Sequence, residues 1–358
     1  MWPFNKNTQL QPATASTSEL GLGMLTAADL VAALPDPVMV IGRDGTVVMA
    51  NDLVKAAIDA DPLGLHLSAT VRAPAVLDAV ADVLAGEAAH HVDYELRFPV
   101  LRSFHAYVAP FGSPQNGTAI IVLRDLTREQ QIERMRADFV ANASHELRTP
   151  LASLSGFIET IQGAARNDEK AQTKFLGLMR SQADRMKRLI DDLLSLSRIE
   201  MNEHVRPNTQ VDVAQVANHV RDVLSGMAKD TGCDLQVTTP GPLMVLGNRD
   251  ELVQVVQNLI ENALKYAGTG KTVEVDVTRE GQHVALSVKD QGPGIAEEHI
   301  PRLTERFYRV NVQESRSRGG TGLGLAIVKH ILNRHRGRLT IASEIGRGST
   351  FTIRLPAK

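Results

Sequence analysis

The sequence has little of what marks disulfide-linked, membrane-spanning or nucleic-acid-binding proteins. Its single cysteine, Cys233, cannot form an internal disulfide, which fits a reducing compartment. The formal net charge of -2 leaves no basic surface for nucleic acid or for an anionic membrane. No run approaches the ~18 to 20 consecutive apolar residues that a spanning helix needs. We therefore expect a cytoplasmic protein that binds no nucleic acid.

The N-terminal residues 1–24 also lack the positive region and apolar core of a signal peptide. They are rich in Ser, Thr, Gln and Pro, which predicts a disordered tail. The rest of the 358 residues, with 43% hydrophobic and 22% charged side chains overall, is enough for two or three globular domains with their own cores.

Residues 25–125 combine a short helical pattern, two apolar strands joined at Asp44 and Gly45, further short helices, and three strand-like runs. This order of elements, together with the segment DPVMVIGRDGTVVMAN at 36–51, resembles a PAS-type sensor domain. The resemblance implies that a small ligand or a protein partner acts on this domain.

From Leu126 onward the pattern is helical, and it runs without a break into residues 138–161. Apolar residues recur there at spacings of three and four on one stripe, while His145 and Thr149 lie one turn apart on the polar side. Pro150 lacks an N–H, so we expect a kink just past His145 and Glu146. Taken alone, this pattern fits an ordinary surface histidine.

A second apolar-periodic helix follows from about Glu169 to Ile199, after a turn near residues 163–168. Two antiparallel helices cannot enclose a core by themselves. The pattern therefore predicts a homodimer that forms a four-helix bundle.

Arg206 and Pro207 indicate a hinge into a last domain, in which helical segments and alternating strands follow one another as hairpins. This organisation favours an α/β sandwich with one mixed sheet covered by helices on one face. At the end of one such strand stands Asp290, followed by Gly292 and Gly294, which let the chain turn tightly next to a ligand. Its carboxylate suits recognition of an exocyclic amine.

Two further clusters lie in the same domain. Gly320, Gly322 and Gly324 lead into an apolar-periodic helix, whose free N–H groups and dipole favour phosphate. Asn258 and Asn262 lie four apart on another helix, and Lys265 follows three residues later. Their amide oxygens suit Mg²⁺, and the ammonium group suits phosphate oxygens.

Each cluster alone is weak, because glycines most often only make turns and paired Asn residues are most often solvated. The P-loop and Rossmann patterns are absent. The combination of the three clusters in one domain favours a nucleotide site of another type.

The segment around His145 resembles the H box of the sensor histidine kinases of two-component systems. NLIENALKY, DQGPGIA, RFYRV and GTGLGLAIVKHI resemble the N, G1, F and G2 boxes of that family, over residues 134–356. HIPRLTERFYRV and SRSRGGTGLGLAIVKHIL are most similar to the phosphate-regulon sensor kinases. Those kinases usually carry transmembrane helices before the PAS domain, and none is visible here. Beside the cytoplasmic location expected above, membrane association through a partner stays open.

The resemblance implies a multidomain α+β protein. A PAS-like antiparallel sheet domain would span 25–125. A signalling helix and a helical-hairpin dimerisation and phosphoacceptor domain would span 126–204. An ATP-binding α/β sandwich of the GHKL (Bergerat) type would span 205–358, with a mobile lid at about 297–321.

The same resemblance implies residue roles. His145 would be the phosphoacceptor, Glu146 would remove its proton, and Thr149 would orient a water for phosphatase chemistry. Asn258 and Asn262 would hold Mg²⁺ with the ATP phosphates. The remaining implied nucleotide contacts are Lys265 and Tyr266 at phosphate and ribose, Asp290 with Gly292, Gly294 and Thr350 around adenine, and Gly320, Gly322, Leu323 and Gly324 at the phosphates.

The implied function is an ATP-dependent histidine kinase that passes its phosphoryl group to an aspartate of a response regulator and also acts as a regulator phosphatase. Three alternatives stay open: mainly a phosphatase, a non-catalytic dimeric scaffold in the same signalling pathway, or another ATPase with the same sandwich, of the chaperone or topoisomerase type.

Overall fold

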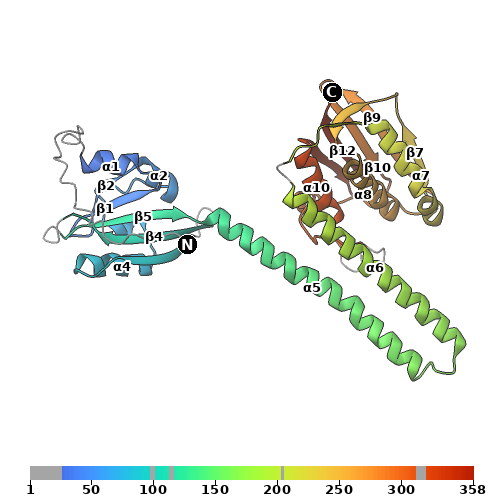
Figure 1. Ribbon diagram of the computed structural model, residues 1–358, viewed down its shortest axis with the longest axis horizontal. Coiled ribbons are helices and arrows are strands. Elements are labelled where there is room, and N and C mark those ends of the chain that lie inside the picture. The colour runs from blue at the N-terminus through green and yellow to red at the C-terminus, as the bar shows by residue number, and fades with distance from the viewer. Residues whose placement is uncertain (1–25, 97–100, 113–116, 203–204, 312–319) are drawn as a thin grey trace, which may run out of the picture. The chain divides into compact units, whose positions relative to one another are not determined.

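The computed structural model describes residues 26–96, 101–112, 117–202, 205–311 and 320–358. The chain divides into two compact units, Met1–Asp138 and Phe139–Lys358, and the division falls inside one long helix (Figure 1). The predicted tail at 1–24 lies outside the described residues, as does the part of the predicted lid at 312–319.

The first unit is built on a five-stranded antiparallel sheet with the strand order β2-β1-β5-β4-β3. Its elements in chain order are α1 (Ala27–Ala33), β1 (Val38–Ile41), β2 (Val47–Ala50), α2 (Asp52–Ile58), α3 (Leu67–Thr70), α4 (Pro74–Leu84), β3 (His90–Leu96), β4 (Arg102–Pro110) and β5 (Ala119–Asp125). This is the predicted order of elements, and the antiparallel sheet is confirmed. The PAS-type resemblance itself stays a prediction.

Strand β1 explains how this unit is layered, because all four of its residues are buried. Successive side chains point to opposite faces of a strand. Met39 and Ile41 belong to the core under α2, α3 and α4, whereas Val38 and Val40 pack with Val31 of α1 on the other face. The sheet therefore lies between helices on both sides (Figure 1).

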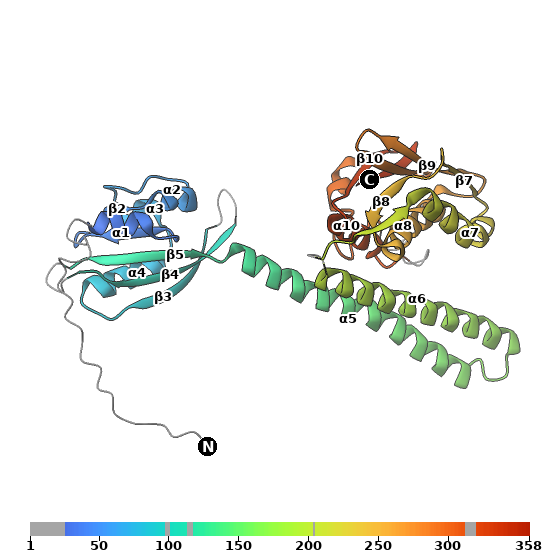
Figure 2. The same cartoon turned by 45° about the horizontal axis from the view of Figure 1, so that its top comes forward.

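The second unit begins within α5 (Thr127–Gln162), whose later part forms an antiparallel helical hairpin with α6 (Glu169–Met201), as Figure 2 shows. The Asp168 side chain caps α6 by accepting a hydrogen bond from the Ala171 N–H at 3.0 Å. The rings of Phe157 and Phe175 contact each other across the hairpin. Both helices and the predicted turn are confirmed. Helix α5 continues through the buried Pro150, and the kink there stays a prediction.

The remainder of this unit is a five-stranded sheet with the order β11-β12-β10-β9-β7, in which β7 and β9 are parallel and the other neighbours are antiparallel. Its elements are β6 (Thr209–Asp212), α7 (Val213–Thr231), β7 (Asp234–Thr238), β8 (Met244–Gly247), α8 (Arg249–Ala267), β9 (Thr272–Glu280), β10 (His283–Lys289), η3 (Glu297–Arg302), α10 (Gly324–Arg334), β11 (Arg338–Glu344) and β12 (Gly348–Pro356). Strands β6 and β8 form a small second sheet.

One continuous core joins this sheet to α7, α8 and α10. Val275 and Val277 alternate inward from β9, and Leu259 and Ile327 meet them from the helices. The predicted sandwich, a mixed sheet with helices on one face, is confirmed. Within the described ranges, no helix combines the length and the apolar character that crossing a membrane requires.

Candidate functional site

The N-terminus of α10 lies directly against the middle of α8. A Cβ at Gly324 would come within 2.7 Å of the Asn258 Oδ1 atom, so the approach depends on glycine at this position. Leu323, which precedes the helix, is fully buried and anchors its start. Among the described residues, no side chain caps this end of α10. Its first N–H groups and the positive end of its dipole are therefore available to an anion.

The turn before α10 is held to a second loop. Gly322 has a φ of 77°, and its carbonyl accepts a hydrogen bond from the Phe307 N–H at 2.8 Å. A Cβ at Gly322 would approach the Phe307 backbone to 2.9 Å. Gly320 is half-buried just before this turn. The RFYRV segment and the glycine-rich segment before α10 are thus hydrogen-bonded and closely packed against each other.

Helix α8 presents the predicted polar row beside this piece. Asn258 and Asn262 are half-buried, and the Asn258 Nδ2 donates to the Gln254 carbonyl, which leaves its Oδ1 turned toward α10. One turn further along, the Lys265 ammonium lies 3.0 Å from a carboxylate oxygen of Glu261. Amide oxygens next to a cation and a helix N-terminus form a donor set that suits a nucleotide phosphate with a hard metal ion.

Asp290 lies at the end of β10 and is 5% exposed. Its Oδ1 accepts a hydrogen bond from the Gly292 N–H at 2.8 Å. Burial raises the pKa of the Asp290 carboxyl, and the backbone hydrogen bonds partly offset this effect. A Cβ at Gly292 would approach the Tyr266 carbonyl to 2.6 Å, so this loop is packed against the end of α8. A buried carboxylate of this kind can select a ligand that donates to it.

Two predicted residues lie around Asp290. Gly294 has a φ of 74° and lies against the backbone of Glu344 at the end of β11. Thr350 is half-buried on β12 and pairs with Lys289, the residue before Asp290. The structure therefore gathers both around the same strand ends.

On α5, His145 and Thr149 are exposed, and the Thr149 hydroxyl donates to the His145 carbonyl at 3.2 Å. The Glu146 side chain is different, because it is only 13% exposed. Its Oε2 accepts from the Arg185 Nη2 of α6 at 2.7 Å and from the Arg309 Nη2 at 3.0 Å. Such charge-assisted hydrogen bonds fix the orientation of the carboxylate.

The helical hairpin also contacts the loop before α10. Arg309 donates to the Thr321 carbonyl at 2.6 Å as well as to Glu146. Asp192 of α6 accepts from the Thr321 hydroxyl at 2.7 Å. Sequence reasoning missed Arg185 and Asp192 entirely. Arg309 falls inside the quoted segment RFYRV, but nothing in the sequence pairs it with Glu146, which is 163 positions away.

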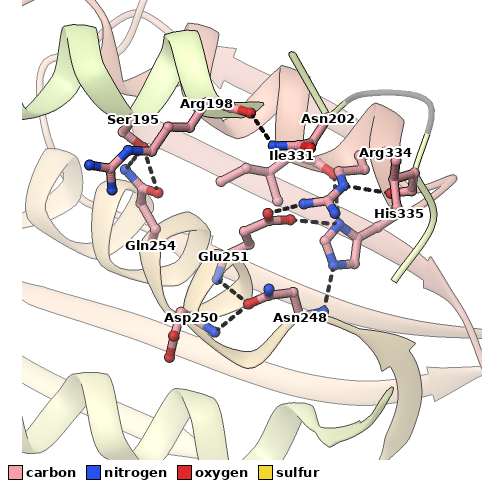
Figure 3. A network of polar contacts seen from close by, with 11 residues as sticks. Ser195, Arg198, Asn202, Asn248, Asp250, Glu251, Gln254, Ile331, Arg334 and His335 are labelled. Carbon is pink, nitrogen blue, oxygen red and sulfur yellow. Dashed lines mark hydrogen bonds and ion pairs between the residues drawn. The ribbon is translucent and has the colours of Figure 1, made fainter. Parts of the chain in front are cut away.

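A buried network fixes the start of α8 relative to the end of α10 (Figure 3). The His335 Nε2 accepts from the Asn248 N–H at 3.0 Å, and its Nδ1 donates to the Ile331 carbonyl at 2.8 Å. Asn248 in turn caps α8 by accepting from the Asp250 and Glu251 N–H groups. Burial lowers the pKa of His335, so this ring is held neutral.

Two further contacts extend the network in Figure 3. Glu251 pairs with Arg334, and burial raises the pKa of the Glu251 carboxyl. Ser195 of α6 and Gln254 of α8 exchange a side-chain hydrogen bond near 3 Å. Polar groups outside the set of candidate residues therefore connect α6, α8 and α10, the helices that carry or contact those residues.

Two family models match the chain. The model described as His Kinase A (phospho-acceptor) domain matches residues 135–202. The model described as histidine kinase-, DNA gyrase B- and HSP90-like ATPase matches residues 247–358. The first match contains α6 and most of α5, and the second contains α8 through β12.

Curated relatives match about two thirds of the chain. The chain is 40% identical over 237 residues to the phosphate regulon sensor protein PhoR of Pseudomonas aeruginosa, a match that covers 66% of this chain and 54% of that protein. It is 39% identical over 244 residues to the sensor protein kinase WalK of Staphylococcus aureus, covering 67% of this chain and 58% of that protein. The matches thus span little more than half of these relatives.

Among solved structures, the histidine kinase ThkA in complex with the response regulator protein TrrA resembles the chain with a TM-score of 0.50 at 18% sequence identity. The match covers 93% of this chain and 99% of that one. At this identity the likeness concerns the fold alone.

Proposed function

Because the chain belongs to the sensor histidine kinases of two-component systems, we propose that it transfers the γ-phosphoryl group of ATP to His145 and then to an aspartate of a response regulator receiver domain. One observation carries the proposal. Glu146, next to His145, is joined through Arg309 to the loop that opens α10. The turn of α5 that carries His145 and the loop that opens α10 thus belong to one connected set of residues.

In this proposal His145 acts as an exposed nucleophile. A neutral imidazole nitrogen attacks the γ-phosphorus while the bond from that phosphorus to the bridging oxygen breaks and ADP leaves. The proton on the other ring nitrogen passes to the neighbouring Glu146 carboxylate. Phosphoryl transfer depends on positioning and charge neutralisation more than on covalent chemistry by the protein. The two arginines that hold Glu146 supply part of the positioning.

The nucleotide roles follow the geometry of the second unit. Asp290 accepts a hydrogen bond from the adenine amine, with Gly292, Gly294 and Thr350 around it. The phosphates lie at the N-terminus of α10, where Gly320, Gly322, Leu323 and Gly324 shape the cradle, and Lys265 and Tyr266 contact phosphate and ribose. The cradle that a Cβ at position 324 would fill supports this placement.

We place Mg²⁺ at Asn262 and Asn258, whose amide oxygens are the kind of ligand that this hard cation prefers. When bound, the ion neutralises charge on the phosphate oxygens. The Asn258 Oδ1 turned toward the N-terminus of α10 fits this role.

A homodimer is part of the proposal. Val140 and Leu151 of α5 and Leu194 of α6 are 58%, 56% and 52% exposed in the single chain. Apolar stripes of this kind on a helical hairpin are buried by a second hairpin in a four-helix bundle. We also assign residues 25–125 to sensing of a small ligand or protein, 126–204 to dimerisation and phosphoacceptance, and 205–358 to ATP binding.

A second activity, hydrolysis of the phosphoaspartate on the regulator, is favoured by Thr149. Its hydroxyl proton is engaged by the His145 carbonyl, so the exposed oxygen offers lone pairs that can orient an attacking water. Replacement of Thr149 by Ala should slow regulator dephosphorylation and leave autophosphorylation intact. Unchanged phosphatase turnover would remove this role.

The kinase assignment is tested by incubation of the purified protein with γ-labelled ATP and Mg²⁺. The wild type should gain an acid-labile, base-stable phosphate, and His145→Ala and Asp290→Asn should not. His283→Ala, at an exposed histidine of β10, is the matched control and should label like the wild type. Steady release of inorganic phosphate without a labelled protein would favour the general ATPase alternative, and absence of nucleotide binding would favour the scaffold.

A further inference from the structure

A group of polar side chains crosses the two strands at one edge of the first sheet. On β3, the edge strand (Figure 2), Asp93 pairs with His105 of β4. Two residues away on the same strand, His91 pairs with Tyr107 of β4. Paired residues point to the same face of a sheet, so the four side chains lie together. His91, Asp93 and Tyr107 are exposed, and His105 is half-buried. This group is therefore open to a solute.

The two histidines form a hydrogen-bonded row that ends on a carboxylate. The His105 Nδ1 donates to the Asp93 Oδ1 at 2.5 Å. An ionised carboxylate only accepts, so a neutral His105 ring carries its proton on Nδ1 and presents a lone pair on Nε2. The His91 Nδ1 lies 3.0 Å from that Nε2 and donates to it. Asp93 thus decides which nitrogen of His105 can bind an electrophile.

Ring contacts orient both imidazoles. The rings of His91 and His105 stack with their centroids 5.2 Å apart, and the Tyr107 ring lies 4.9 Å from the His91 ring on its other strand neighbour. Side chains that are already oriented lose less conformational freedom when they bind a ligand. The two imidazoles are therefore pre-organised on a rigid element of the fold.

The distance between the two ring nitrogens suits a shared metal ion. Neutral imidazole is a ligand that Zn²⁺ and related divalent ions favour. At Zn–N distances of about 2.0–2.1 Å, two nitrogens of a tetrahedral site lie about 3.3 Å apart. The 3.0 Å between His91 and His105 has to grow by only a few tenths of an ångström. A metal-bound histidine also typically donates from its other nitrogen to a carboxylate, as His105 does to Asp93.

From this geometry we propose that His91 and His105 bind a divalent transition-metal ion, represented by Zn²⁺, and that Asp93 orients His105 for it. The ion replaces the hydrogen bond between the rings. The His91 proton moves from Nδ1 to Nε2, so that Nδ1 becomes a ligand and both rings stay neutral. Water fills the remaining coordination positions. The inference goes beyond the proposed function, because it needs neither a nucleotide nor the kinase reaction.

A second group in the same unit competes for such an ion. Asp82, Glu87 and His90 each offer one ligand atom, and these atoms lie within 4.8 Å of one another. His90 precedes His91 on β3, and its side chain points to the opposite face because successive side chains alternate. Its group supplies one imidazole and two carboxylates, a set that suits harder ions. The two imidazoles of His91 and His105 make the better site for Zn²⁺.

The test is the dissociation constant of Zn²⁺, measured by calorimetry on the full chain without a histidine tag and without nucleotide. Asp93→Asn removes the orienting charge and should raise the dissociation constant about 10- to 100-fold, the typical cost of losing a carboxylate behind a metal-bound histidine. His105→Gln removes a ligand and should raise it at least as much. His90→Gln is the matched control and should bind like the wild type.

A second measurement needs no variant. Electron paramagnetic resonance of Cu²⁺ bound to the wild-type chain should show coupling to two imidazole nitrogens. Absence of Zn²⁺ binding by the wild type, absence of this nitrogen coupling, or an unchanged dissociation constant in both Asp93→Asn and His105→Gln would overturn the site. Loss of Zn²⁺ binding in His90→Gln with binding retained in His105→Gln would overturn it in favour of the second group. The kinase assignment stands in each case, because labelling of His145 tests it separately.

Discussion

Arg309 donates from its Nη2 to the Glu146 carboxylate at 3.0 Å and so joins the turn that carries His145 to the loop that opens α10. Arg185 holds the same carboxylate oxygen from α6 at 2.7 Å. A carboxylate fixed by two guanidinium groups has one defined orientation. In the proposed mechanism this orientation decides whether Glu146 can take the imidazole proton.

Arg185→Met should therefore slow autophosphorylation. We expect a loss on the order of tenfold at saturating ATP, a fraction of the ~10²- to 10⁴-fold that a general base supplies. The Michaelis constant for ATP should change little, because Arg185 lies on the hairpin and not at the N-terminus of α10. Initial labelling rates over a range of ATP concentrations separate the two parameters. Arg180→Met, at an exposed position of α6, is the control, and equal rates for the two variants would contradict the positioning role.

Gly324→Ala tests the contact between α10 and α8. The new methyl group would meet the Asn258 Oδ1 at 2.7 Å, so either the Asn258 side chain or α10 must shift. Both belong to the proposed phosphate and Mg²⁺ site, and nucleotide affinity should therefore fall at least tenfold, about 1.4 kcal/mol. Gly226→Ala in α7 is the opposite case, because nothing lies within 4 Å of the added Cβ. That change should raise stability by about 0.5 to 1 kcal/mol through helix propensity and leave affinity unchanged. Calorimetric titration and thermal unfolding measure both effects, and unaltered affinity in Gly324→Ala would argue against the cradle.

Local patterns predicted the elements of this fold because each is decided by neighbours in sequence. The 3.6-residue period located both hairpin helices, and alternation located strands such as β9 and β10. The glycine-rich segments and Asp290 were found for the same reason. The ion pairs of Glu146 were not predictable, because Arg185 and Arg309 lie 39 and 163 positions away and carry no periodic signal. The same holds for His335, whose partner Asn248 is 87 positions away.

His335 predicts an acid-sensitive contribution to stability. Burial lowers its pKa below the usual 6.5, so the folded chain binds this proton less tightly than the unfolded chain does. The contribution is fully present above pH 6.5 and is lost as the pH falls from there toward the folded pKa, with a slope of up to about 1.4 kcal/mol per pH unit. The raised pKa values of Glu251 and Asp290 act in the opposite direction, because protonation favours their folded state.

The difference in the free energy of unfolding between the wild type and His335→Gln separates the contribution of His335 from those of Glu251 and Asp290. Calorimetry should show that the substitution lowers the free energy of unfolding at pH 7.5, and that this loss is smaller at pH 5.5. The variant should cost about 1 to 3 kcal/mol near neutrality, because the Asn248 N–H and the Ile331 carbonyl lose buried partners. His283→Gln at the exposed start of β10 should be neutral at both values. A pH-independent cost would show that His335 does not titrate in this window.

A charged residue introduced among the exposed apolar residues of the helical hairpin tests the proposed dimer. Leu151→Glu places a carboxylate at a position that the proposed bundle buries, and the cost of an unpaired buried charge should drive the protein to monomers. Analytical ultracentrifugation at micromolar concentration distinguishes the two states. Ile345→Glu, at a 71% exposed position outside the hairpin, should leave the wild-type distribution. A monomeric wild type, or a dimer unaffected by Leu151→Glu, would contradict this arrangement.

The central claim is that His145 receives the phosphoryl group of ATP. Tandem mass spectrometry of the autophosphorylated protein, digested and kept at alkaline pH so that phosphohistidine survives, locates the modification directly. The account predicts one phosphoryl group, on the imidazole of His145, formed in the wild type and absent from Asp290→Asn. A phosphoryl group on any other residue, or an unmodified His145 in protein that consumes ATP, would contradict it.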